Sequence, residues 1–308
     1  MFFGVREIKE HDVLSSCSTG ASQLTPAPLR VAVPIFAATS LVFFFALYLV
    51  LPALRNRAFP WFAIYNIVLV LPTVLLVFAA LVAYALEGRS FTWAGVRERF
   101  RLGKMESACW FWTAALSIFM FGGRYALYIA FALTVPAVLI ETSSRPRVSS
   151  RWLLGIAAYL AGSWLIWQSQ PIFRPIPLHS EPQALREFLE QFGATSFMGI
   201  PLSGNWWIPA YYLAVLLVGN IAGEELWWRG YLLPRQELVH GASTWVVHGV
   251  LWAAFHLFFQ TTAWDMIRMI PTCCALAFVA QHTKNTWPGI VGHTFGNSGF
   301  LLQILHGV

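Results

Sequence analysis

Apolar stretches long enough to cross a bilayer as helices recur from residue 29 to the end of the chain. Hydrophobic residues make up 57% of the 308-residue sequence and charged residues only 11%, whereas a soluble domain is ordinarily about 25% charged. None of the stretches alternates with the two-residue period of a membrane barrel strand. The sequence therefore predicts an all-α membrane protein, a polytopic bundle of transmembrane helices.

The predicted spans number eight or nine, depending on one segment. Residues 107–141 form two spans if the chain turns at Gly122-Gly123-Arg124, and one bent helix with a re-entrant end if it does not. Residues 89–104 mix Trp, Phe and Arg, which suits a helix at the membrane surface as well as a solvated loop. The other spans are expected at 29–54, 61–86, 152–167, 206–233, 244–259, 266–281 and 287–305, with a short amphipathic helix at 182–192.

The charged residues predict orientation and do not indicate nucleic-acid binding. The formal net charge is +6, but no basic stripe with interleaved aromatic residues is present. With the N-terminus inside, the inner connections of nine spans hold about twice as many Lys and Arg residues as the outer ones. We therefore expect a cytoplasmic N-terminus and a location in the plasma (inner) membrane. A single crossing at 107–141 would reverse the orientation of everything that follows.

Three ionisable residues, Glu224, Glu225 and Arg229, stand close together in the span 206–233. An ionised Glu or Arg near the centre of a membrane helix costs about 2.5–3.5 kcal/mol to insert. Glu225 and Arg229 are four residues apart and can pair on one helical face, if only to fix helix packing. Glu224 is rotated by about 100° from Glu225, with Asn220 one turn before it and no basic residue three or four positions away. One carboxylate is therefore expected to be paired and the other to be free for chemistry.

Two later predicted spans carry further polar residues. In the seventh span Trp252 precedes His256 by one helical turn, and in the ninth span His293 precedes Asn297 by four residues. Either histidine alone is more typical of a hydrogen-bonded core residue, so the prediction depends on the set. If the three helices meet, a carboxylate, two imidazoles and an amide converge around one point.

This combination of side chains suits the hydrolysis of a carbonyl compound. A carboxylate removed from water becomes a stronger base, and with an imidazole beside it can deprotonate a water molecule. A second imidazole and an Asn amide can donate hydrogen bonds to the oxyanion that forms. The same Glu and two His could instead hold a divalent metal, although the chain has no His-Glu-x-x-His helix. The spacing alone leaves both possibilities open.

The order Glu-Glu-x-x-x-Arg, aromatic-x-x-x-His and His-x-x-x-Asn on late membrane helices resembles the CPBP family. This family comprises the type II CAAX prenyl endopeptidases and bacterial relatives described as bacteriocin-processing or immunity proteins. The resemblance covers about residues 211–305 and departs at Trp252, where the family more often has Phe. The site residues that it implies are Glu224 and His256 to activate water, His293 and Asn297 for the oxyanion, and Glu225 and Arg229 for support.

The sequence therefore predicts an intramembrane endopeptidase that hydrolyses a peptide bond of a membrane-associated or lipidated protein. The resemblance implies a glutamate mechanism without an obligatory metal, and zinc is the alternative. The expected partners are the peptide or protein substrate and the lipid bilayer. Two other classes fit the same free carboxylate: a transporter that carries protons or cations, and a non-catalytic immunity or scaffold protein. A transporter often has two halves with a span broken by Gly or Pro at the same position of each, and the sequence contains no such pair.

These expectations divide the chain into three parts. Residues 1–28, polar and mixed in charge, are predicted to form a mobile cytoplasmic tail. Residues 29–205 hold the N-terminal spans and loops, and residues 206–308 form the catalytic transmembrane core. Among the other histidines, His248 shares roughly the helical face of His256, and we expect a structural role for it.

Overall fold

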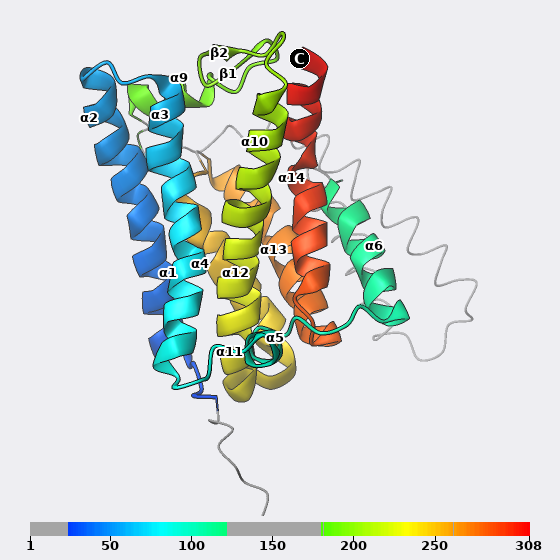
Figure 1. Ribbon diagram of the computed structural model, residues 1–308. Helices are drawn as coiled ribbons and strands as arrows, with labels where there is room; N and C mark the ends of the chain where they lie inside the picture. The colour runs from blue at the N-terminus through cyan, green and yellow to red at the C-terminus, as the bar shows by residue number, and fades with distance from the viewer. Residues whose placement is uncertain (1–23, 122–179, 181, 261) are drawn as a thin grey trace, which may run out of the picture.

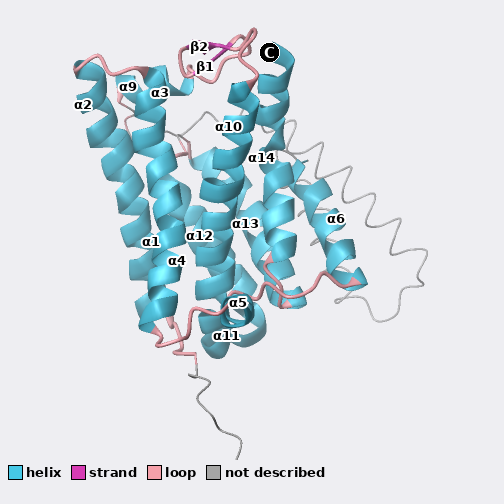
Figure 2. Cartoon of the chain, in the orientation of Figure 1, coloured by secondary structure: helices cyan, strands magenta, loops and turns pink. Residues whose placement is uncertain are grey.

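The computed structural model describes residues 24–121, 180, 182–260 and 262–308. This part of the chain is mostly helical, with a short strand pair at one end of the bundle (Figure 2). By length and composition, three of its helical stretches can cross a membrane: Leu29–Asn56, Trp61–Leu86 and Trp207–Phe258. They support a helical integral membrane protein, and they do not confirm the predicted count of eight or nine spans. The spans predicted between residues 122 and 179 lie outside the described residues.

The first two predicted spans lie side by side as an antiparallel pair (Figure 1). The turn between them ends at Pro60, whose ring disfavours a helical conformation in the preceding residue. The limits of the pair agree with the predicted 29–54 and 61–86. Its elements are α1 (Leu29–Phe44), η1 (Phe45–Val50), α2 (Leu51–Asn56), α3 (Trp61–Tyr65), η2 (Asn66–Val70) and α4 (Leu71–Leu86).

The motif-bearing part of the chain forms a second set of antiparallel helices (Figure 1). Its first reversal is at Gly241, whose φ of 55° is a conformation that glycine adopts readily. Its last two helices have 21 residues each, long enough to cross a bilayer, but they are less apolar than α1 and α4. Its elements are α10 (Trp207–Val215), η4 (Leu216–Gly223), η5 (Leu226–Leu232), α11 (Leu233–His240), η6 (Gly241–Ser243), α12 (Thr244–Phe255), η7 (His256–Phe258), α13 (Ala263–Thr283) and α14 (Trp287–Gly307).

The remaining described elements lie beside the bundle or at its ends (Figure 1). The helix predicted at 182–192 is present as α9 (Gln183–Leu189), next to the hairpin of β1 (Ser196–Phe197) and β2 (Ile200–Pro201). At the opposite end lies α5 (Trp93–Arg99), followed by α6 (Ser107–Phe121), which packs against α14.

Small residues let the motif-bearing helices approach their neighbours closely. A Cβ atom on Gly223 would lie 2.8 Å from the carbonyl oxygen of Thr73 in α4. A Cβ atom on Gly292 of α14 would lie 2.7 Å from the side chain of Leu116 in α6. Glycine at these two positions therefore fixes how near α4 and α6 come to the helices that carry the polar residues.

The structure of residues 89–104 favours the predicted surface helix over a solvated loop. Phe91 and Trp93 are each 65% exposed, whereas Arg99 at the other end of α5 is only 3% exposed. Exposed aromatic rings beside the end of an apolar span are typical of the membrane–water interface. The Arg99 end of the segment is therefore packed against the bundle, whereas the rings of Phe91 and Trp93 face outward.

Segment 99–101 also holds two motif-bearing helices in place. The Arg99 guanidinium donates hydrogen bonds to the carbonyl oxygens of residues 230 and 231 near the end of η5, at 3.1 Å and 3.4 Å. Thr286, directly before α14, donates its hydroxyl and its N–H to the carbonyl oxygens of residues 100 and 101, at 2.7 Å and 2.9 Å. Segment 99–101 thus fixes η5 and α14 relative to each other.

The ion pair between Glu87 and Arg99 makes the stability of this loop depend on pH. Two hydrogen bonds of 2.6 Å and 2.7 Å join the guanidinium to the carboxylate. Burial alone would raise the pKa of Glu87, but the hydrogen bonds and charge of Arg99, with help from Arg89, lower it overall. A lowered pKa means that the stabilisation is present above the unfolded value of about 4.3 and is lost as the pH falls through the folded value.

We therefore expect Glu87→Gln to lower the unfolding temperature by a few degrees at neutral pH, with the difference shrinking as the pH is lowered. Thermal unfolding in detergent from pH 7 to pH 3 measures this. Glu98→Gln, at an exposed position of α5, is the matched control. A Glu87→Gln deficit that is equal at every pH would show that the charge of Glu87 contributes nothing.

Candidate active site

The two acidic residues of the first motif lie where the chain passes from one π-helical stretch to another. Glu224 follows η4 and Glu225 precedes η5. The π-helical turns are wider than α-helical ones and occur frequently at functional sites in proteins. The two side chains nevertheless diverge as the helical period predicts, so that Glu225 is directed into the bundle core and Glu224 toward a cavity.

Glu225 and Arg229 form a fully buried ion pair, each with 0% of its side chain exposed. The distance from Arg229 Nη1 to Glu225 Oε1 is 3.2 Å, and the same carboxylate oxygen lies 3.0 Å from Nδ1 of His293. The guanidinium also stacks on the ring of Trp252, with its Cζ atom 3.6 Å from the ring centroid. This pairing agrees with the four-residue spacing, and it ties the first motif to α12 and α14.

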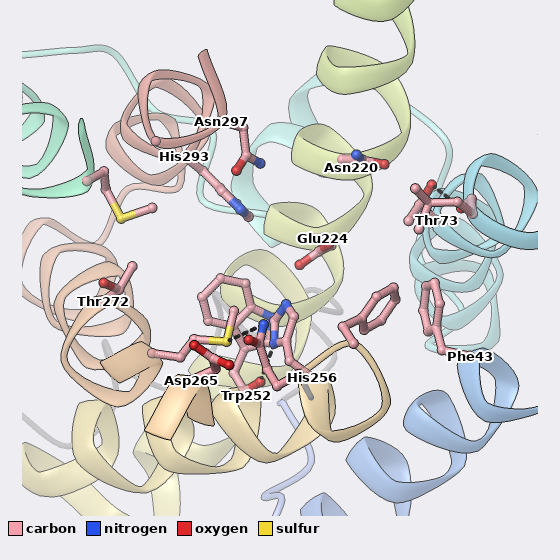
Figure 3. A pocket seen from close by; sticks show the side chains of 16 residues that line it. Phe43, Thr73, Asn220, Glu224, Trp252, His256, Asp265, Thr272, His293 and Asn297 are labelled. Atoms are coloured by element: carbon pink, nitrogen blue, oxygen red, sulfur yellow. Dashed lines mark hydrogen bonds between the residues drawn. The ribbon is translucent and has the colours of Figure 1, made fainter. Parts of the chain in front are cut away.

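Glu224 lies at the wall of a cavity of about 440 Å³ inside the bundle. Its side chain points into the space between His293 and Asn297 on one side and His256 and Trp252 on the other (Figure 3). Residue Glu224 is 8% exposed, and its Oε2 atom has no hydrogen bond of ordinary geometry among the described residues. The carboxylate that the spacing left without a basic partner is thus the one that faces the cavity.

Hydrogen bonds at Nδ1 determine which way each histidine can act. Nδ1 of His256 lies 2.8 Å from the Trp252 carbonyl oxygen. A carbonyl only accepts, so this nitrogen carries the proton and Nε2 of the neutral ring is an acceptor. Nδ1 of His293 donates in the same way to the Glu225 carboxylate, so Nε2 of His293 is an acceptor in the neutral ring and a donor only in the imidazolium.

The arrangement can therefore bind water and an oxyanion at different positions. Glu224 and Nε2 of His256 are both acceptors, and together they can accept hydrogen bonds from the two O–H groups of one water molecule, leaving an oxygen lone pair for attack. The amide of Asn297 can donate to an oxyanion, and His293 can do so as an imidazolium supported by Glu225. In that state two carboxylates balance one guanidinium and one imidazolium, so the buried cluster is electrically neutral.

Other residues of the cavity were not part of the predicted set. Asn220 lies one turn before Glu224, on the same wall, and its Oδ1 atom has no hydrogen bond of ordinary geometry among the described residues. The four-residue spacing between the two is the signal that could have identified it. Asp265 also lines the cavity and accepts a hydrogen bond of 2.6 Å from the Thr262 hydroxyl. Nothing in the sequence near Asp265 indicates its position, because it depends on how α13 packs.

His248 has the structural role expected of it. It is 0% exposed, and its Nδ1 atom lies 2.6 Å from Oε1 of Gln236 in α11. The amide oxygen accepts, so the ring donates from Nδ1. His248 is also absent from the lining of the cavity that holds His256, so sharing a helical face did not bring it to the site.

The metal alternative finds partial support in the hydrogen bonds of the histidines. Metal-binding histidines ordinarily donate their second N–H to a carbonyl or carboxylate, as His256 and His293 do here. Among the described residues, however, no group of three or more His, Cys, Asp and Glu side chains is arranged to hold a metal ion.

The segment that contains this site is similar to a known protein family. The family model described as type II CAAX prenyl endopeptidase Rce1-like matches residues 205–299, from just before α10 to within α14. No curated protein and no solved structure matches the chain. The matched segment contains all three motifs, with Glu224, His256 and Asn297 at its cavity. Residues 205–299 are thus similar to the type II CAAX prenyl endopeptidases, the family that the motifs predicted.

Proposed function

We propose that the chain is an intramembrane endopeptidase that hydrolyses a peptide bond of a membrane-associated or lipidated protein. The observation that carries this proposal is the Glu224 carboxylate, which faces a cavity together with His256, His293 and Asn297. The match of residues 205–299 to the Rce1-like endopeptidases supports the same reaction. The apolar stretches on which the site is built support a substrate that reaches it from the bilayer or its surface.

In the proposed reaction Glu224 and His256 hold one water molecule and take a proton from it as it attacks the peptide carbonyl carbon. The carbonyl oxygen becomes an oxyanion, which accepts hydrogen bonds from the Asn297 amide and the His293 imidazolium. The tetrahedral intermediate then breaks at the C–N bond. The proton held at Glu224 passes to the leaving nitrogen, which yields a carboxylic acid and an amine, and the amine then takes the acid proton, so that the products separate as a carboxylate and an ammonium group.

The remaining parts of the proposal concern location and partners. The proposed location is the plasma (inner) membrane, and the distribution of Lys and Arg in the sequence supports a cytoplasmic N-terminus. The proposed partners are the substrate protein and the lipid bilayer, without nucleic acid. Residues 206–308 are proposed as the catalytic core, because the three motifs and most of the cavity lie in them.

The direct test uses the purified full-length protein in lipid nanodiscs and a set of lipidated and unlipidated membrane-anchored peptides. Mass spectrometry of the products is expected to show a new amino terminus with the wild-type protein and none with Glu224→Gln. A comparison of membrane proteins from cells that carry each form would then identify the natural substrate. Glu224-dependent counterflow in proteoliposomes, with no cleavage, would replace the proposal with a transporter.

We also propose that no metal is obligatory, since a Glu–His pair can activate water without one. Treatment with EDTA or phenanthroline is therefore expected to change the cleavage rate by less than about twofold, far below the loss that follows removal of a catalytic metal. The measurement is a rate assay before and after chelation, with metal content determined in parallel. Loss of activity that zinc restores would establish the metal mechanism instead.

The close approach of α14 to Glu225 gives a test at a position without any catalytic group. A Cβ atom on Gly289 would lie 2.5 Å from Glu225 Oε2, so Gly289→Ala must displace the carboxylate that holds His293. Overpacking of this kind costs about 1–3 kcal/mol, and we expect a fall in kcat of about tenfold or more.

Gly299→Ala on the same helix is the matched control, because a Cβ atom there meets nothing within 4 Å. Steady-state kinetics of the two variants measures the difference. Equal activity of Gly289→Ala and Gly299→Ala would mean that the contact of Glu225 with His293 is irrelevant to the reaction.

A further inference from the structure

Trp252 occupies the centre of the polar cluster. It is 1% exposed, and its ring packs edge-to-face against His256 and His293, with centroid distances of 5.0 Å and 5.4 Å. The Arg229 guanidinium stacks on the face of the same ring, and the backbone carbonyl oxygen of Trp252 accepts a hydrogen bond from Nδ1 of His256. The ring therefore sets the spacing of three motif residues, which any aromatic side chain of similar size could do.

The indole N–H of Trp252 has a different significance. This donor is buried and has no hydrogen bond of ordinary geometry among the described residues, and the same is true of the acceptor Oε2 of Glu224. Both residues line the same cavity, and the indole is directed toward the Glu224 carboxylate (Figure 3). Leaving a buried donor and a buried acceptor unpaired is unfavourable for both, so a small approach of the two groups stabilises each of them. Catalytic hydrogen bonds are often long before substrate binds and shorten in the reacting complex.

We propose that the indole N–H of Trp252 is a positioning donor for Glu224. It holds one oxygen of the carboxylate, so that the other faces Nε2 of His256 and the attacking water. This inference rests on the proposed peptidase function, and it deepens that function by adding a residue that acts through Glu224. A phenylalanine at position 252 would keep an aromatic ring beside Arg229, His256 and His293, but it would lose the donor together with part of the ring.

Two replacements separate the donor from the ring. Trp252→Phe shortens the ring and removes the N–H, whereas 3-benzothienylalanine at position 252 keeps the size of the indole and replaces the N–H with sulfur. We expect both to lower kcat by about 10- to 100-fold, the effect of one hydrogen bond to a charged group, with KM changed by less than about twofold. Wild-type kcat in the benzothienylalanine variant would overturn the proposal, because it would leave only the ring as important.

Trp228→Phe is the matched control. Trp228 is 0% exposed, its indole N–H is likewise without a hydrogen bond of ordinary geometry among the described residues, and its ring stacks on Phe36 at 4.2 Å. It does not line the cavity. We expect Trp228→Phe to lower the unfolding temperature as much as Trp252→Phe does, with kcat lowered by less than about threefold. Equal loss of kcat in the two Phe variants would assign both effects to packing.

A spectroscopic measurement keeps this test independent of peptidase activity. The indole ¹⁵N–¹H resonances of Trp252 and Trp228 can be assigned from the two Phe variants of the labelled full-length protein. We expect Glu224→Gln to shift the Trp252 resonance and to leave that of Trp228 unchanged. An unshifted Trp252 resonance would refute the hydrogen bond, whereas a shifted resonance in a protein that cleaves no peptide would refute the peptidase function alone.

Discussion

Replacement of Glu224 with Gln is expected to lower kcat for peptide cleavage by about 10²- to 10⁴-fold, the usual contribution of a general base. Gln has nearly the same size and shape, but its amide nitrogen is a donor and neither of its polar atoms can take a proton at neutral pH. The water would lose the carboxylate that takes its proton, and His256 alone would remain as a base. Binding of substrate depends on the rest of the cavity, so KM should change little.

The same replacement should not harm folding. Glu224 is 8% exposed, and its Oε2 atom has no hydrogen bond of ordinary geometry among the described residues, so loss of water is the largest effect on the ionised side chain. An uncharged amide at this position removes a buried charge, and the unfolding temperature should equal or exceed that of the wild type. Cleavage rate and thermal unfolding of Glu224→Gln are measured together, with Glu98→Gln at an exposed position as the control. Undiminished cleavage would remove Glu224 from the mechanism.

The parts of this site that the sequence predicts are those that depend on local geometry. An ion pair between Glu225 and Arg229 follows from their four-residue spacing, and the different direction of Glu224 follows from its rotation by about 100°. The directions of the two acidic side chains survive, because both residues stand between the π-helical stretches η4 and η5, and Arg229 pairs with Glu225 although it lies within η5. The first two spans are similarly predictable, since nearly every residue in them is apolar.

The parts that the sequence does not predict depend on how helices pack. The hydrogen bond between His293 and Glu225 joins residues 68 positions apart, and no local period relates them. Stacking of Arg229 on Trp252 and the pairing of segment 99–101 with η5 and α14 are of the same kind. The number of spans is hard to predict for another reason: α13 and α14 are long helices whose polar residues lower their average hydrophobicity.

Removal of the Arg229 guanidinium is expected to have the largest effect on stability. Glu225 is fully buried, and its partners among the described residues are Arg229 and His293. Breaking a buried ion pair by truncating one member ordinarily costs about 3–5 kcal/mol, because the remaining charge is left without compensation. We therefore expect Arg229→Met, which keeps an apolar stem of similar length, to lower the free energy of unfolding by about this amount. Unfolding in mixed micelles of increasing SDS content measures it.

The double variant Glu225→Gln with Arg229→Met separates charge compensation from packing. If the cost of Arg229→Met arises from an uncompensated carboxylate, neutralising that carboxylate should restore most of the lost stability. Activity should not return with it, because a Gln at position 225 no longer supports an imidazolium at His293, and the oxyanion would keep only Asn297 as a donor. A double variant as unstable as Arg229→Met alone would instead place the cost in the lost stacking on Trp252. Stability that returns without activity would show that the buried pair serves the reaction by holding the charge on His293, and not only the packing of the helices.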